Sequence, residues 1–227
     1  MTLIFDWDGT LHNTLSLYGN AFRTAYDYLI KEGLAEPRVY TDLDVSVYLG
    51  MNAPDMWHKF MPELPEDIMK SADAIVGREM VSAVDRGSAK LFDGALDMLD
   101  TLKRRGHTLL FLSNCTHAYQ EAHRKHFDLD KRFSHMFCCE DYGNIPKEDI
   151  FRYISSMYEG PYVMIGDRAS DIKVAEVNGI MSIGCTYGFG TEGELAGADL
   201  LAASCPDIIR CVEELSSRCD RDRAQNS

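Results

Sequence analysis

The chain has 227 residues, 45% of them hydrophobic and 26% charged, and is long enough to bury a core in one or two domains. Its formal net charge of −13 argues against a nucleic-acid partner, because clustered lysines and arginines bind phosphate backbones. No apolar stretch approaches the roughly 18 residues of a transmembrane helix. The N-terminus lacks a basic segment followed by an apolar one, so we expect a cytoplasmic protein with no membrane partner.

A short apolar strand is predicted over residues 2–5, and it runs directly into Asp6 and Asp8. Buried parallel strands are continuously apolar, so two carboxylates at the end of one need a functional explanation. Gly9 and Thr10 follow and favour a turn away from the strand. The opening segment therefore predicts a chemical site at a strand end.

Residues 15–88 show helical periodicity and no convincing strand. Apolar residues recur at helical spacing from Leu17 onward and again over residues 66–84. Prolines divide the segment between them into shorter helical pieces. We predict a small all-α cap domain over residues 15–88, inserted into a catalytic core made of residues 1–14 plus 89–227.

From Leu91 onward, short apolar runs alternate with helical patterns. The strand-like runs are residues 107–113, 133–139, 162–166, 181–185 and 199–203. The helical patterns are residues 94–105, 116–127, 147–158, 170–178 and 207–215. Apolar runs separated by helices of about 10 to 15 residues indicate βαβ units and a parallel sheet. The predicted fold class is therefore α/β, a Rossmann-like parallel sheet sandwiched by helices. The polar tail over residues 217–227 is expected to fray.

Polar residues follow several of these strands. Ser113 and Asn114 end one strand, Asp167 follows another, and Asp171 lies at the start of the next helix. Lys147 begins the helix before the strand of Asp167. In open parallel sheets, ligands bind beyond the carboxyl ends of the strands. We therefore expect these side chains to meet the two aspartates of the first strand at one edge of the sheet.

Several carboxylates cannot share a pocket uncompensated, because like charges raise one another's pKa. Mg²⁺ resolves this, since it prefers oxygen ligands at about 2.0–2.1 Å, completed by water and phosphate oxygens. Ser113 and Lys147 would then supply a hydrogen-bond donor and a positive charge for a phosphoryl group. Asp6 could act as a nucleophile and Asp8 could move protons for it. The predicted partner is a small phosphorylated metabolite, and the predicted cofactor is Mg²⁺.

Stretches of this chain resemble the four motifs of the haloacid dehalogenase superfamily, in the same order. They are DWDGT at residues 6–10, Ser113, Lys147, and GDRASD at residues 166–171. The resemblance covers nearly the whole chain and is to the phosphatases that carry a helical cap. The stretch TYGFGTEGELAGAD at residues 186–199 further resembles phosphoglycolate-phosphatase-like members.

The resemblance implies a role for each aspartate. Asp6 would be the nucleophile that forms an aspartyl-phosphate, and it would also bind the metal. Asp8 would be the acid and base, with its backbone carbonyl on the metal. Asp167 would bind the metal directly, and Asp171 would do so directly or through water. Asp171 could instead be a first-turn acid that the helix dipole favours.

The resemblance also implies that Ser113 and Lys147 orient the phosphoryl group, together with the backbone amide of Asn114. Ser113 and Asn114 could instead cap the next helix, and Lys147 could be a solvated helix residue. Asn13 stands where the family often has an aspartate, so we assign it no catalytic role. Lys147 lies in PKED and not in the more common KPxP context. Arg168 is interpreted as an ion-pair residue.

These expectations combine into a Mg²⁺-dependent phosphatase that hydrolyses a small phosphomonoester, with phosphoglycolate as one candidate substrate. A phosphomutase or a phosphonatase on the same framework is an alternative. A phosphonatase needs a cap lysine to form a Schiff base, for which Lys31, Lys59 and Lys70 are the candidates. A non-catalytic protein that binds phosphorylated metabolites is a further alternative.

Overall fold

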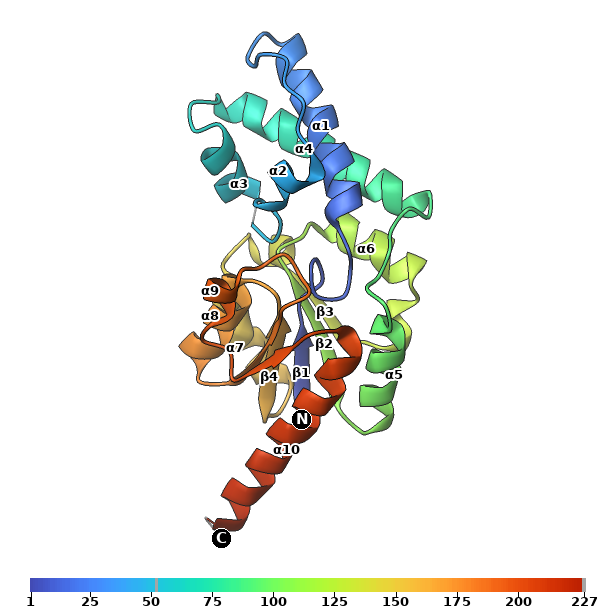
Figure 1. Cartoon of the computed structure of the whole chain (residues 1–227), viewed down its shortest axis with the longest axis vertical. Coiled ribbons are helices and arrows are strands. Elements are labelled where there is room, and N and C mark those ends of the chain that lie inside the picture. The colour runs from blue at the N-terminus through green and yellow to red at the C-terminus, as the bar shows by residue number, and fades with distance from the viewer. Residues whose placement is uncertain (52, 226–227) are drawn as a thin grey trace.

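The computed structural model describes residues 1–51 and 53–225, and six strands of this part form one parallel sheet (Figure 1). The strands are β1 (Thr2–Phe5), β2 (Thr108–Ser113), β3 (His135–Cys138), β4 (Tyr162–Gly166), β5 (Met181–Cys185) and β6 (Leu200–Ala202). Their order across the sheet is β3-β2-β1-β4-β5-β6. β1 and β4 are thus neighbours in the middle, where Phe5 pairs with Ile165, and their carboxyl ends lie side by side.

Helices cover both faces of the sheet, because its strands are apolar on both faces. Leu3 and Phe5 of β1 belong to the apolar cluster of α5 (Ala95–Arg104), α6 (His117–His126) and α10 (Cys205–Gln225). Ile4 belongs to the cluster of α7 (Lys147–Met157) and α8 (Ala169–Asn178). Successive strand residues point to opposite faces, which explains this division. The predicted Rossmann-like α/β fold is confirmed.

Three short helices complete the connections of this core. They are the 3₁₀ helices η1 (Leu129–Lys131) and η2 (Cys139–Tyr142), and the α-helix α9 (Glu192–Leu195). η2 follows β3 directly and leads toward Lys147 at the start of α7. The chain therefore reaches the carboxyl edge of the sheet again between β3 and α7.

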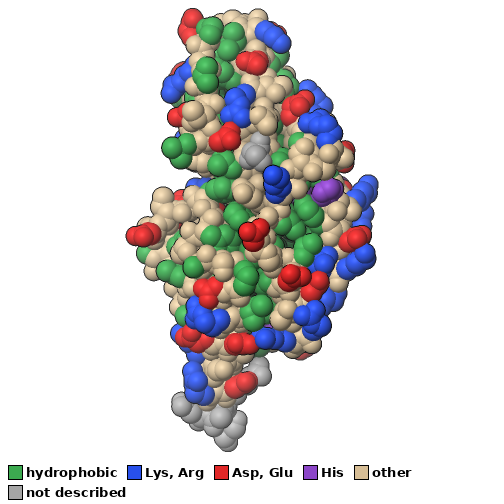
Figure 2. Space-filling model, turned by 45° about the vertical axis from the view of Figure 1, so that its right-hand side comes forward, with side chains coloured by type: hydrophobic (Ala, Val, Ile, Leu, Met, Phe, Trp, Pro, Cys, Tyr) green, Lys and Arg blue, Asp and Glu red, His purple; other side chains and the backbone are tan. Residues whose placement is uncertain are grey.

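Four helices lie between β1 and the rest of the core, as an all-α insertion. They are α1 (Leu15–Lys31), α2 (Asp42–Ser46), α3 (Ala53–Phe60) and α4 (Glu66–Asp85). They enclose an apolar cluster of their own, in which Phe22 and Trp57 are buried. Figure 1 shows these helices above the carboxyl ends of the strands, and the outline of the molecule is indented on one side where they meet the core (Figure 2). We call these four helices the cap.

The two connections between cap and core run side by side. The backbone amide of Asn13, on the way into the cap, donates to the carbonyl of Lys90, on the way out, at 2.8 Å. The amide of Phe92 donates to the carbonyl of Leu11 at 2.9 Å. The chain therefore enters and leaves the cap through neighbouring segments, close to the turn that follows β1.

The predicted strands at residues 2–5, 162–166 and 181–185 agree with the structure, and the other three are shorter than expected by one to three residues. The C-terminal tail differs from its prediction, because α10 continues as a helix to Gln225. Ion pairs of Arg218 and Arg210 with Glu214 support this extension. The expected fraying is therefore corrected for residues 217–225, and residues 226–227 lie outside the described part. None of the described helices has the length and hydropathy to span a membrane.

Candidate active site

The sheet brings the polar residues of the strand ends together. Asp6 follows β1, Ser113 ends β2 and Asp167 follows β4, all at one edge of neighbouring strands. Lys147 and Asp171 reach the same edge from the first turns of α7 and α8. All five side chains are buried, with exposed fractions of at most 3%. The predicted convergence of these residues is therefore present in the folded chain.

Lys147 is a buried cation between two carboxylates. Its Nζ lies 2.6 Å from Oδ1 of Asp6 and 2.8 Å from Oδ1 of Asp171. Burial alone would lower the pKa of Lys147, but the charges of Asp171 and Asp6 outweigh it and raise the pKa. Lys147 therefore stays protonated, and the alternative of a solvated helix lysine does not fit its position.

Asp6, Asp167 and Asp171 form a cluster that suits a divalent cation. One carboxylate oxygen of each lies within 4.8 Å of the others, and all three side chains are buried. Burial and the charge of Asp171 raise the pKa of Asp6 well above its usual value. The same two causes raise the pKa of Asp167 to about 7. Lys147 compensates only part of the charge of these three carboxylates, and such a cluster of oxygen donors suits a hard cation such as Mg²⁺.

Two neighbouring segments fix the orientation of Asp167. The amide of Phe189 donates to its Oδ2 at 2.7 Å, and the hydroxyl of Thr10 donates to its Oδ1 at 3.2 Å. Gly190 lies so close that an added Cβ would overlap the carbonyl oxygen of Asp167. Phe189 and Gly190 belong to the stretch that raised the likeness to phosphoglycolate phosphatases. In this fold, that stretch positions a candidate metal ligand.

Asp171 uses both carboxylate oxygens. Oδ1 accepts from Lys147, and Oδ2 accepts the backbone amide of Arg168 at 3.0 Å. The second bond caps the start of α8, as the alternative interpretation of a first-turn acid expects. The position of Asp171 thus combines helix capping with membership of the carboxylate cluster.

Asp8 lies at the centre of a hydrogen-bond network that the sequence did not reveal. Its Oδ1 accepts from the hydroxyl of Thr14 and from that of Tyr119 at 2.9 Å, and it lies 2.9 Å from Nδ1 of His12. Burial by itself raises the pKa of Asp8, but the hydrogen bond and charge of His12 outweigh it, and the pKa is lowered. His12 is buried, and its ring stacks on that of Trp7. No local sequence pattern marked Tyr119, which reaches Asp8 from the first turn of α6.

Asn114 and Arg168 join the core to the cap. The amide nitrogen of Asn114 donates to the carbonyl of Gly50 at 3.2 Å. The guanidinium of Arg168 donates to the carbonyl of Leu49. Nε and Nη2 of the same side chain donate to the carboxylate of Glu194 at 3.1 and 3.0 Å. Arg168 is thus the expected ion-pair residue, with a contact to the cap in addition. Asn13 is exposed and its backbone contributes to the cap junction.

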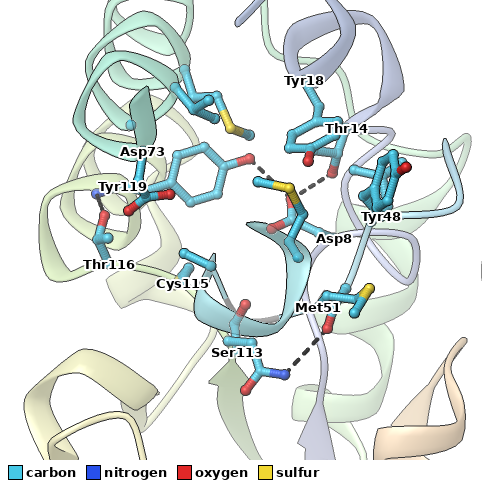
Figure 3. Close-up of a pocket in the computed structure, with 18 of the residues that line it drawn as sticks. Asp8, Thr14, Tyr18, Tyr48, Met51, Asp73, Ser113, Cys115, Thr116 and Tyr119 are labelled. Carbon is cyan, nitrogen blue, oxygen red and sulfur yellow. Dashed lines mark hydrogen bonds between the residues drawn. The ribbon is translucent and has the colours of Figure 1, made fainter. Parts of the chain in front are cut away.

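A cavity of about 410 Å³ lies between these residues and the cap. Asp6, Asp8, Ser113 and Lys147 line its core side. In Figure 3, Tyr119 and Thr14 point toward Asp8. The carboxylate that is the expected nucleophile therefore faces a space large enough for a small metabolite.

Of the three candidate Schiff-base lysines, Lys70 lines this cavity, and Lys31 and Lys59 are not among its described lining residues. Its Nζ pairs with Glu66 at 2.7 Å on an exposed face of α4. The hydrogen bond and charge of Glu66 raise the pKa of Lys70. A Schiff-base lysine needs a lowered pKa, so this environment does not favour the phosphonatase alternative.

The parallel α/β core, the buried cluster of aspartates with its lysine, and the helical cap define the class of cap-bearing hydrolases that act on phosphorylated substrates. Residues 1–179 match the family model described as haloacid dehalogenase-like hydrolase. The chain belongs to this family, and the protein is an enzyme of the hydrolase type.

The chain is similar over nearly its full length to characterised relatives. It is 28% identical to a 5'-nucleotidase of Pseudomonas aeruginosa, covering 95% of both chains. It is 23% identical to a pyrophosphatase of Halalkalibacterium halodurans, covering 93% of this chain and 96% of the relative. Among solved structures, a predicted phosphatase from Clostridium acetobutylicum is 25% identical with a TM-score of 0.81, covering 94% of this chain and 98% of that one.

Proposed function

We propose that the protein is a Mg²⁺-dependent phosphatase that hydrolyses a small phosphomonoester through an aspartyl-phosphate intermediate. The observation that carries the proposal is the position of Asp6, which lies on the cavity floor 2.6 Å from the buried cation of Lys147. Asp8 lies two residues further along the same turn and lines the same cavity. A nucleophile and a proton carrier therefore face one space.

The carboxylates of Asp6, Asp167 and Asp171, with the backbone carbonyl of Asp8, would hold the metal. Bound there, Mg²⁺ supplies positive charge for the phosphoryl oxygens and for the three carboxylates. Lys147 would add a fixed positive charge and the Ser113 hydroxyl a hydrogen-bond donor, which supports binding of an anionic group on this side of the cavity.

In the first half of the reaction, a carboxylate oxygen of Asp6 attacks phosphorus and forms the aspartyl-phosphate. The bond from phosphorus to the ester oxygen breaks, and Asp8 gives its proton to the leaving alcohol. In the second half, Asp8 takes a proton from water as that water attacks phosphorus. The phosphorus–Asp6 bond then breaks, which returns the Asp6 carboxylate, protonated Asp8 and inorganic phosphate.

The substrate itself stays a prediction. The stretch at residues 186–199 suggests phosphoglycolate, and the relatives named above suggest nucleoside monophosphates and pyrophosphate. These three leads define a short panel of phosphorylated compounds. Phosphate release from each compound with Mg²⁺ would rank them by kcat/KM.

The variant Asp6→Asn tests the proposal. Asparagine keeps the shape of the side chain but lacks the nucleophilic oxygen, so we expect phosphate release to fall by at least about 10³-fold. Circular dichroism and thermal melting establish that the variant is folded. The control Asp130→Asn, at an exposed position on η1, should keep full activity. Residual activity of Asp6→Asn near that of the wild type would rule out this nucleophile.

A further inference from the structure

The cavity above Asp6 is larger than a phosphoryl group requires. Its volume of about 410 Å³ is typical of sites for whole small molecules, which are about 300–1,000 Å³. Residues of α1, α4 and the segment between α2 and α3 line the half that belongs to the cap. Under the proposed function, on which this inference rests, the leaving alcohol of the substrate would occupy this half.

Aromatic rings and thioethers form the apolar walls of the cap half. The rings are those of Tyr18 and Tyr48, and the thioethers are those of Met51, Met56 and Met80. Figure 3 shows Tyr18, Tyr48 and Met51 on the same side of the cavity, around Asp8. Aromatic faces pack well against other rings, and methionine adapts its shape to them. These walls suit a flat ring better than a compact anion.

The hydroxyl of Tyr18 is a buried polar group without a hydrogen-bond partner among the described residues. The side chain is only 7% exposed. Burial and the charges of Asp73 and Tyr48 raise its pKa, so the hydroxyl stays protonated. A buried polar group without a partner costs free energy. A ligand with a polar group in the cap half would satisfy this hydroxyl.

The charges around the cap half are mainly negative. Asp73 of α4 lines the cavity in the cap, and Glu140 of η2 lines it from the core side. The indole nitrogen of Trp57 donates to Asp73 at 3.2 Å. Lys70 is the cation that lines this half in the described chain, and Glu66 already pairs with it. A carboxylate accepts hydrogen bonds and repels a second anion. The lining therefore favours a leaving group that donates hydrogen bonds and carries no negative charge.

We propose that the cap half selects phosphomonoesters whose leaving alcohol carries an uncharged aromatic ring with hydrogen-bond donors. The ring would lie against Tyr18 and Tyr48, and a donor on it would reach Asp73. Compounds with a second anionic group beside the phosphate would be poor substrates, because Asp73 and Glu140 repel them.

Matched substrates test this selectivity. A nucleoside 5′-monophosphate carries a neutral aromatic base with donors, and ribose 5-phosphate has the same reacting alcohol without the base. Phosphoglycolate and pyrophosphate carry a second anionic group. We expect kcat/KM of the wild type with Mg²⁺ to be at least about tenfold higher for adenosine or cytidine 5′-monophosphate than for the other three.

Two variants localise the preference. Asp73→Asn removes the negative charge and Tyr18→Phe removes the hydroxyl, each with little change in shape. We expect each to lower the kcat/KM ratio of nucleotide to ribose 5-phosphate by at least about threefold, and Asp73→Asn to raise kcat/KM for phosphoglycolate. The matched controls are Asp85→Asn, at an exposed position of the same helix, and Tyr153→Phe on α7. Both controls should keep the wild-type ratio.

Equal kcat/KM for the nucleotides and ribose 5-phosphate, or a preference for phosphoglycolate or pyrophosphate, would overturn the inference. Failure of every compound to release phosphate would instead contradict the proposed function. In that case, binding measured by calorimetry with the Asp6→Asn protein tests whether the cap half prefers an aromatic ring. Binding of adenosine 5′-monophosphate at least about tenfold tighter than ribose 5-phosphate supports it, and equal binding overturns it.

Discussion

At the scale of single residues, Asp8 illustrates how partners set the protonation of a carboxyl group. Hydroxyl groups of Thr14 and Tyr119 donate to one of its oxygens, and His12 lies at hydrogen-bond distance from the same oxygen. Donors of this kind stabilise the ionised form. The network thus suits Asp8 for taking a proton from water, and it sets the pH below which Asp8 keeps its own proton.

The variant Tyr119→Phe should change the pH dependence of the reaction. Loss of one donor to the carboxylate raises the pKa of Asp8. Asp8 must carry its proton to act on the leaving alcohol in the first half of the proposed reaction, so the alkaline limb of the kcat/KM profile should move to higher pH. We also expect kcat to fall by about tenfold at neutral pH, because the orientation of Asp8 loosens. Tyr153→Phe on α7 serves as the control. An unchanged profile would show that Tyr119 has no influence on the proton carrier.

In the protein without metal, the contribution of Asp167 to stability should grow as the pH falls from about 7 to about 4. Burial and the charge of Asp171 raise the pKa of Asp167 to about 7, against about 3.9 in an unfolded chain. Between these values folded Asp167 binds a proton that it lacks in the unfolded chain. Its contribution to the free energy of unfolding therefore falls by up to about 1.4 kcal/mol as the pH rises by one unit within this window.

Thermal melting in the presence of a chelator measures this trend, and Asp167→Asn should reduce it. Added Mg²⁺ should raise the melting temperature more at about pH 8 than at about pH 5, because a cation favours ionised carboxylates. Identical pH trends for the wild type and Asp167→Asn would contradict the assigned cause.

At the scale of elements, the segment between β5 and α9 holds Asp167 in place. Gly190 permits the close approach, because a side chain there would overlap the backbone of Asp167. The variant Gly190→Ala should therefore displace Asp167, lower kcat/KM by at least about tenfold and weaken stabilisation by Mg²⁺. Gly193→Ala, in α9, meets no atom closer than 3.9 Å and should behave as the wild type. Equal kcat/KM values for both variants would refute this role of the segment.

The strands of the core and the polar residues at their carboxyl ends could be predicted, because continuous apolar runs and the residues after them are local features of the sequence. The candidate nucleophile and Asp167 followed from these strand ends, and Lys147 and Asp171 followed from the starts of two helices. The partners of Asp8 and the walls of the cap could not be predicted in this way. Tyr18, Asp73 and Tyr119 come from α1, α4 and α6, and only the packing of these helices brings them to one cavity. The length of α10 also depended on side-chain pairs that composition does not reveal.

At the scale of the whole molecule, Arg168 links the candidate metal cluster to the cap. It follows Asp167 in the chain, pairs with Glu194 and donates to the carbonyl of Leu49 in the cap. The variant Arg168→Ala should loosen the segment around Leu49, which lines the cavity. We expect faster hydrogen exchange there and a rise in KM of about three- to tenfold, with a smaller effect on kcat.

Hydrogen exchange measured by mass spectrometry locates the change. Arg152→Ala, an exposed arginine beside Tyr153 on α7, is the control and should leave exchange in the cap as in the wild type. Protection of the Leu49 segment that is equal in Arg168→Ala and the wild type would show that this contact does not hold the cap.

The hydrogen bond between Asn13 and Lys90 joins the two ends of the cap insertion at the core. Because the cap leaves and returns through adjacent backbone segments joined by hydrogen bonds, the path of the core chain hardly depends on what is inserted between them. A different helical insertion could replace residues 15–88 without moving the ends of β1, β2 and β4. Under the proposed function, the core residues would break the bond to phosphorus, and an exchangeable module would decide which alcohol leaves.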